Sequence, residues 1–193
     1  MGKSLSEMTL EELWQLFPIV LKEHNPMYKE WYLAEKEEIL RAVGSATVKR
    51  INHIGSTSVE GLVAKPTVDI LLEIGADCDL ESLKQNLKAA GWTCMSWADE
   101  PAIRASFNKG YTPQGFAEKV YHLHVRRLGD WDELYFRDYL RDHREVAEEY
   151  ERLKTGLKEQ YEHDRDGYTN AKTDFIKGHM AKARAEYPDR YKL

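Results

Sequence analysis

The clearest chemistry in this sequence lies in a short turn rich in hydroxyl groups, Gly55-Ser56-Thr57-Ser58. The turn follows a β-forming segment, residues 46–54. Where a strand ends in such a turn, unpaired backbone N–H groups and hydroxyls point toward one spot, and that arrangement suits an anion such as phosphate. We therefore predict that Gly55, Ser56, Thr57 and Ser58 belong to a phosphate site.

An acidic side chain follows in a place where a carboxylate needs a partner. Asp69 comes thirteen residues after Ser56, inside an apolar, β-forming stretch, residues 67–74. Burying an unpaired carboxylate is costly, so a divalent cation or a basic side chain such as Lys65 should accompany it. Lys65 could also neutralise a phosphate as a point charge.

Two histidines lie on another expected strand, residues 119–125. His122 and His124 are two residues apart, so they share a face of that strand. A neutral imidazole can hydrogen-bond phosphate or act as an acid or base near neutral pH. A histidine metal site would instead favour zinc, iron or nickel over Mg²⁺. Together with Asp69, these histidines are the candidate catalytic residues.

Two further pairs sit one helical turn apart and therefore share a helix face. Arg137 and Arg141 could form an anion clamp, and Tyr168 and Lys172 could close the same cleft. Each pattern also has a plainer interpretation. The turn could be structural, Asp69 could pair with Lys65 or Arg137, and the arginines could pair with nearby acids. We expect the charged run at residues 144–158 to be a solvated helix face.

The periodicity of the chain predicts six helices and five strands. The helices are expected at residues 9–24, 28–43, 80–90, 131–140, 142–163 and 167–187, with Asp142 and Glu145 resembling a capping box. The strands are expected at residues 46–54, 67–74, 92–97, 103–107 and 119–125, with a loop at residues 108–117. This order predicts an α/β (α+β) fold: a mixed β-sheet flanked by helices, with a C-terminal helical bundle.

Composition limits the classes of protein to which the chain can belong. The 193 residues are 42% hydrophobic, which suits one domain with a real core. We divide that domain into an N-terminal helix (1–27), an α/β core (28–128) and C-terminal helices (129–193). The net charge of −5 argues against nucleic acid as a partner. No apolar run is long enough to span a membrane, and Cys78 and Cys94 lack metal-ligand spacing, so we expect a cytoplasmic protein.

A resemblance to a known family adds to this reading. The chain resembles the bacterial GrpB-like family of the nucleotidyltransferase superfamily through the stretches at residues 53–59, 61–62, 64–66 and 69–70, together with Tyr121-His122-Leu123-His124-Val125, residues 136–141 and residues 168–175. The resemblance extends from about residue 28 to residue 179. It implies a nucleotidyltransferase-like fold and a cleft for a nucleotide or another phosphorylated small molecule.

The resemblance also implies a chemistry and its cofactor. The superfamily transfers nucleotidyl groups with Mg²⁺ held by two or three carboxylates, the second lying two residues after the first. Asp69 fits the first position, but Leu71 occupies the second. Glu73 shares the face of Asp69, although four strand residues span about 13 Å, too far for both acids to bind one ion. We therefore expect Mg²⁺ at Asp69 and Glu73 only if substrate phosphates bridge two ions.

Other functions stay open alongside nucleotidyl transfer. The departure at Leu71 favours a binding module that recognises a nucleotide or anion without turning it over. Relatives that are fused to dephospho-coenzyme-A kinase suggest an accessory role, in folding or regulation, in coenzyme-A-related metabolism. A metal-dependent hydrolase with histidine ligands, and with zinc in place of Mg²⁺, is the remaining alternative.

Overall fold

A five-stranded mixed sheet forms the centre of the computed structural model, which describes residues 3–192. Its order is β1-β2-β5-β4-β3, with β2 and β5 parallel and the other neighbours antiparallel. The strands are β1 (Val48–Ile54), β2 (Val68–Ile74), β3 (Thr93–Ala98), β4 (Arg104–Thr112) and β5 (Gly115–Arg127). The predicted mixed sheet flanked by helices is therefore confirmed.

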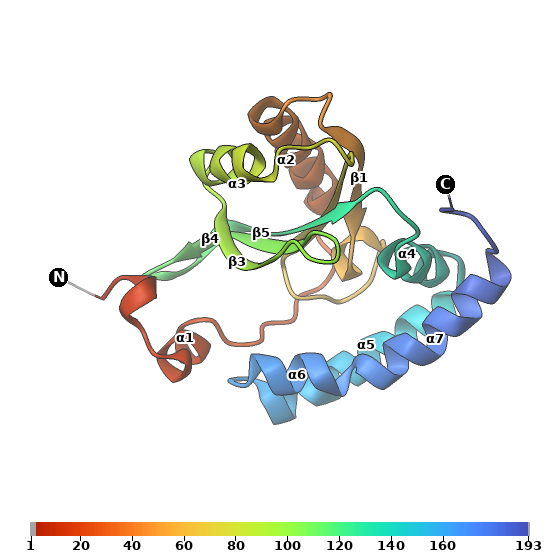
Figure 1. Cartoon of the computed structure of the whole chain (residues 1–193). Helices are drawn as coiled ribbons and strands as arrows, with labels where there is room; N and C mark the ends of the chain where they lie inside the picture. Colours follow the sequence, from red (N-terminus) through yellow and green to blue (C-terminus); the bar gives the residue numbers. More distant parts are fainter. Residues whose placement is uncertain (1–2, 193) are drawn as a thin grey trace.

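The two faces of the sheet carry different side chains because neighbours in a strand alternate. On β2, Val68, Ile70, Leu72 and Ile74 are fully buried in the main core. Helices α2 (Met27–Val43) and α3 (Leu80–Ala89) cover this face (Figure 1). The opposite face carries the polar residues of β2. It looks toward the C-terminal helices α4 (Asp132–Asp142), α5 (Arg144–Tyr161), α6 (Arg165–Ala171) and α7 (Thr173–Glu186).

The N-terminal helix is shorter than predicted. After a 3₁₀ turn, η1 (Leu5–Glu7), helix α1 covers only Leu10–Leu16, and the expected helix over residues 9–24 is wrong. Pro18 disfavours helical geometry at Phe17 and offers no N–H for the helix to continue. Residues 18–25 then form no helix. The Ile19 N–H donates to the Glu162 carbonyl, next to the end of α5, and Lys22 pairs with Ala64, in the segment that precedes β2.

Two expectations for the C-terminal helices are also wrong. Asp142 does not cap a helix: it is the last residue of α4, and its carboxylate accepts a hydrogen bond from the Tyr187 hydroxyl at 2.6 Å. The single helix expected at residues 167–187 is split at Lys172 into α6 and α7. Thr169 and Asn170 precede this break, and both residue types have low helix propensity.

The loop expected at residues 108–117 is instead the end of a long hairpin. Strands β4 and β5 continue to a tight turn, with Tyr111 opposite Phe116 and Thr112 opposite Gly115. A bulge near Gly110 allows this, because Gly110 has φ of +91° and a Cβ there would lie 2.2 Å from the Lys119 carbonyl oxygen. Only glycine fits such a close approach of two strands.

No helix within residues 3–192 is long and apolar enough to cross a membrane.

A buried ion pair on the polar face ties β1 to β2. Arg50 donates to both Glu73 oxygens, at 2.5 Å and 2.7 Å, and the Glu73 side chain is fully buried. The Gly129 N–H also donates to Glu73 at 3.1 Å. Removing the arginine would leave a buried carboxylate without its charge partner, which costs more than losing an exposed pair.

We predict that Arg50→Met lowers the free energy of unfolding by about 3–5 kcal/mol. The matched control is Arg41→Met, which breaks an exposed pair with Glu38 and should cost less than about 1 kcal/mol. Urea denaturation followed by circular dichroism measures both. Equal losses in the two variants would contradict the assigned role of the buried pair.

Candidate functional site

The pairing of β2 with β5 places the predicted acid and histidines together. Asp69 pairs with His122 and Leu71 with His124, on the face toward the C-terminal helices. His122 Nδ1 lies 3.2 Å from Asp69 Oδ1, and His124 Nε2 lies 3.7 Å from the same oxygen. On its other side, His122 Nε2 lies 2.8 Å from the Tyr111 hydroxyl. A carboxylate only accepts hydrogen bonds, so His122 carries its proton on Nδ1 and accepts from Tyr111 at Nε2.

The charges in this cluster follow from burial and hydrogen bonding. Burial alone would raise the pKa of the Asp69 carboxyl, but the hydrogen bond from His122 and the nearby imidazole of His124 outweigh it and hold that pKa well below its usual range. Burial also lowers the pKa of His122, against the opposing effect of Asp69. Near neutral pH, Asp69 is therefore an anion and His122 a neutral, oriented imidazole.

The predicted glycine turn abuts Asp69 directly. Gly55 has φ of +70°, and a Cβ at this position would lie 2.5 Å from Asp69 Oδ2. Both the left-handed backbone and the close contact require glycine. The turn continues as a 3₁₀ helix, η2 (Ser56–Ser58).

The three hydroxyls of this turn have different partners. Ser58 donates to the Gly55 carbonyl at 2.6 Å. Thr57 donates to the Thr67 carbonyl at 3.0 Å and accepts from His53 Nε2 at 2.9 Å. Burial lowers the pKa of His53 to about 4, so His53 stays neutral and holds the turn in place. Ser56 is the one of the three whose hydroxyl contacts a basic side chain, because Lys154 Nζ donates a hydrogen bond to it at 3.1 Å.

A cationic cavity of about 280 Å³ opens in front of this turn. Four basic side chains line it, with Asp69 as the one carboxylate among its described lining residues. The lining consists of Gly55, Ser56, Thr57, Lys65, Thr67, Asp69, His122, Tyr150, Lys154, Arg165, Tyr168, Thr169 and Lys172. Although the chain carries a net charge of −5, this cavity is locally positive.

The lysines of the cationic cavity are held in an environment that disfavours their charge. Burial and the neighbouring Arg165 lower the pKa of Lys65 to about 8. Burial and Lys65 lower that of Lys172 to about 8. Burial and Lys172 lower the pKa of Lys154 to about 7. Desolvation and repulsion between like charges both act in this direction.

One residue that lines the cationic cavity has a buried hydroxyl without a protein partner. The Tyr168 hydroxyl belongs to a fully buried side chain and makes no hydrogen bond within the described chain. Lys172 Nζ lies over its ring, 4.4 Å from the centroid. Since buried polar groups are normally paired, a ligand oxygen is a natural partner for this hydroxyl.

The predicted arginine clamp does not form, because other groups use its donors. Arg137 is buried and donates to Asp138, Asn52, the His53 carbonyl and the Tyr191 hydroxyl, at 2.8 to 3.2 Å. Arg141 donates twice to the Ser58 carbonyl, at 3.1 and 2.8 Å. Both arginines therefore support the turn from behind rather than lining the cationic cavity.

Two basic residues of the cavity were missed from sequence. Lys154 was placed on a solvated helix face, yet it is buried and donates to the Val63 carbonyl and to Ser56. The sequence does contain a pattern that indicates burial of Lys154. This lysine continues the i, i+4 spacing of Val146 and Tyr150, which lie on the buried face of α5. Arg165 opens α6, and no sequence pattern marks it.

The donor set does not fit a protein-held Mg²⁺ ion. Asp69 Oδ1 already faces two imidazoles, Leu71 is fully buried among apolar side chains, and Glu73 is bound by Arg50. Within residues 3–192, no cluster of three or more His, Cys, Asp or Glu side chains is placed to hold a metal ion. The surrounding lysines would also repel a bare cation. Mg²⁺ stays a prediction from the resemblance, and zinc a prediction from the paired histidines.

The family follows from a comparison with known proteins. The model of the GrpB protein family matches residues 18–182. The chain belongs to the GrpB family. The glutamate-rich protein GrpB of Alkalihalophilus pseudofirmus is 35% identical over 164 residues, which is 82% of this chain and 91% of that protein. The crystal structure of conserved protein GrpB from Enterococcus faecalis superposes with a TM-score of 0.75 and 26% identity, covering 87% of this chain and 99% of that one.

A more distant solved structure also aligns with the chain. Cid1 in complex with its short product ApU aligns with a TM-score of 0.42 and 14% identity, over 77% of this chain and 42% of Cid1. This alignment is too loose to bear on activity. The GrpB relatives establish the fold and the family, and the site must be argued from its own geometry.

We predict that the free energy of unfolding of the ligand-free protein rises between about pH 7 and pH 9. The folded pKa values of the three cavity lysines, about 7 to 8, lie below their ordinary 10.5. The unfolded chain therefore binds more protons in this window, and stability increases as pH rises. Lys172→Met should flatten the slope, because it removes one of these groups. The exposed Lys177→Met is the control and should keep the wild-type slope; identical slopes in all three proteins would contradict the prediction.

Proposed function

We propose that the cationic cavity binds the phosphate groups of a nucleotide or another phosphorylated small molecule. The observation that carries the proposal is the charge of the cavity: Lys65, Lys154, Arg165 and Lys172 surround one carboxylate, whose Oδ1 faces two imidazoles. An anion of two or more negative charges would reverse the repulsion that lowers the lysine pKa values. The donors include Lys172 and the Ser56 and Tyr168 hydroxyls, which suit several phosphate oxygens at once.

Asp69 would otherwise oppose an anionic ligand, and its surroundings limit that effect. Its Oδ1 faces the two imidazoles, and its Oδ2 lies against the Gly55 backbone. The carboxylate thus fixes the orientation of His122 and offsets part of the lysine charge. In this proposal Asp69 positions the other groups, and the cations and hydroxyls contact the ligand.

Calorimetry with pyrophosphate, in the absence of Mg²⁺, tests this proposal. We expect Lys172→Met to weaken binding about tenfold or more, since hydrogen bonds to charged groups contribute about 1.5–3 kcal/mol. The exposed Lys177→Met on α7 is the matched control and should bind like the wild type. Equal affinity in all three proteins, or no binding by the wild type, would refute the phosphate site.

Proton uptake gives a second, independent readout. Near pH 8 the cavity lysines are partly deprotonated, and a bound phosphate raises their pKa values. Binding should therefore take up protons, which appears as a dependence of the measured enthalpy on the ionisation enthalpy of the buffer. A binding enthalpy that is the same in all buffers at pH 8 would contradict the role of the lysines.

Nucleotidyl transfer is a second candidate function, and one observation favours it. His122 is neutral, its Nδ1–H is directed at Asp69, and its Nε2 accepts from the Tyr111 hydroxyl. In such a reaction an acceptor hydroxyl or amine would attack the α-phosphorus of a nucleoside triphosphate and pyrophosphate would leave. The acceptor's proton would pass to the Tyr111 hydroxyl oxygen while the proton of that hydroxyl moves to His122 Nε2. The cationic side chains would stabilise the negative charge that develops on the leaving group.

Release of pyrophosphate from nucleoside triphosphates tests transfer, with water as the simplest acceptor. If His122 is the base, His122→Gln should slow release about a hundredfold or more while leaving pyrophosphate affinity within about twofold. His179→Gln, on α7, is the control because His179 bonds only the Phe175 carbonyl among the described residues. Binding without any release by the wild type would leave the binding function and eliminate the enzyme.

A further inference from the structure

A second, larger cavity adjoins the cationic one. It measures about 480 Å³, and Lys65, Thr67 and Arg165 line both cavities. The two cavities therefore adjoin at these three side chains. The two spaces share cations at their junction and differ in what lies beyond it.

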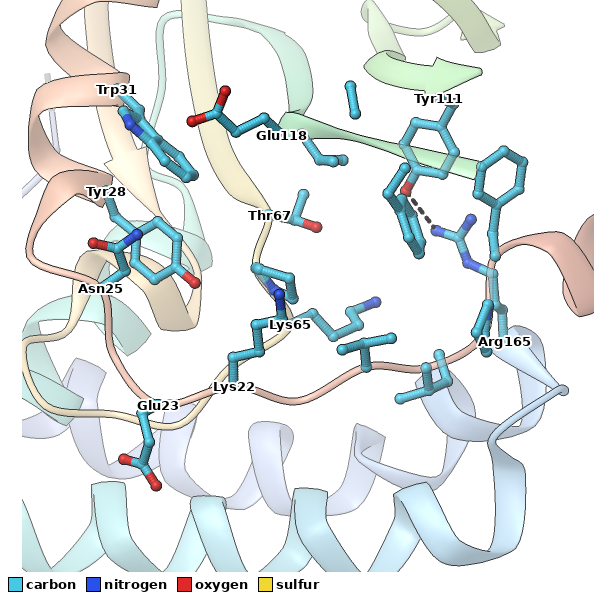
Figure 2. Close-up of a pocket in the computed structure, with 18 residues that line it drawn as sticks. Lys22, Glu23, Asn25, Tyr28, Trp31, Lys65, Thr67, Tyr111, Glu118 and Arg165 are labelled. Carbon is cyan, nitrogen blue, oxygen red and sulfur yellow. Dashed lines mark hydrogen bonds between the residues drawn. The ribbon is translucent and has the colours of Figure 1, made fainter. Parts of the chain in front are cut away.

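Aromatic side chains stand on two opposite walls of the second cavity, which we call the aromatic cavity. Tyr28 and Trp31 of α2 form one wall, with ring centroids 5.5 Å apart in an edge-to-face arrangement. Phe17, Tyr111 and Phe116 form a cluster on the other side, with centroids 4.9 to 5.3 Å apart. Figure 2 shows Trp31 and Tyr28 facing Tyr111 across the space, with Thr67 and Lys65 between them.

Polar groups also line this aromatic cavity, among them Lys22 and Glu23 beside Lys65. Asn25 and Glu118 sit beside the Trp31 wall (Figure 2) and offer an amide and a carboxylate. On the opposite wall, the Arg165 guanidinium carbon lies 5.6 Å from the Tyr111 ring centroid and its Nη2 lies 3.4 Å from the Tyr111 hydroxyl. Aromatic walls with a few hydrogen-bonding groups suit a flat ring with polar edges.

We infer that the aromatic cavity holds the base of a nucleotide whose phosphates occupy the cationic cavity. This inference rests on the proposed phosphate site and adds the class of ligand. Lys65 and Arg165, at the junction, contact the phosphates nearest the sugar. The base stacks on the aromatic side chains, which is tolerant of base identity because every base has a π-face.

The experiment compares a nucleotide with its phosphates alone. Binding of ATP and of inorganic tripolyphosphate is measured by calorimetry for the wild type, Trp31→Ala and Trp31→Phe. Trp31→Ala should weaken ATP about tenfold, within the range known for base stacking, and leave tripolyphosphate unchanged. Trp31→Phe keeps an aromatic ring, so ATP affinity should stay within about threefold of the wild type.

A substitution at a second residue of the aromatic cavity, Phe116, tests the inference if Trp31→Ala does not fold. Phe116 is 40% exposed, and Phe116→Ala should weaken ATP binding selectively in the same way. Trp97 packs against the main core and lines neither cavity, so Trp97→Phe is the control and should alter neither ligand.

The outcomes separate this inference from the proposed function. Equal affinities of the wild type for ATP and tripolyphosphate, or equal weakening of both ligands in the folded variants, would overturn the base site and keep the phosphate site. If neither ligand binds, the phosphate site itself fails and the base site fails with it.

Discussion

The parallel pairing of β2 with β5 is the constraint on which the site depends. It sets Asp69 beside His122 on the polar face, while the adjacent Ile70 and Leu123 enter the core. A shift of one residue in either strand would turn a charged group into the apolar core. The Asp69 carboxylate then fixes the His122 tautomer and requires glycine at position 55. The turn, the imidazoles and the cationic cavity are consequences of this one register.

The cationic cavity lowers the stability of the ligand-free protein. Lys65, Lys154 and Lys172 are brought together where burial and mutual repulsion lower their pKa values to about 7 to 8. Without an anion, this arrangement costs free energy, and perturbed groups of this kind gather at functional sites. Other contacts on the polar face offset this loss of folding free energy. They are the Arg50–Glu73 ion pair and the hydrogen bonds from Arg137 to its four partners.

Much of the fold followed from sequence, and the failures have identifiable causes. The apolar stretch around Asp69 predicted β2, the β-forming segment around His122 predicted β5, and the run of glycine and hydroxyl residues at positions 55–58 located the turn. The N-terminal helix was overextended because the apolar periodicity continues past Pro18, where the backbone cannot remain helical. The roles of residues paired one helical turn apart were harder to predict. Arg137 and Arg141 have the spacing of an anion clamp, but spacing does not reveal that Arg137 donates to Asp138 and Tyr191. Lys154 was predicted to be solvated because it lies in a charged run. Its position four residues after Tyr150 nevertheless places it on the buried face of α5.

The most direct test of the phosphate site is a crystal structure with tungstate, whose anomalous signal locates a phosphate-like anion without ambiguity. The account predicts a tungstate within hydrogen-bonding distance of Lys172 and of the Ser56 or Tyr168 hydroxyl, with Asp69 still bonded to His122. It would be contradicted by anions bound only elsewhere on the protein, or by a cation coordinated to Asp69 with the lysines turned away.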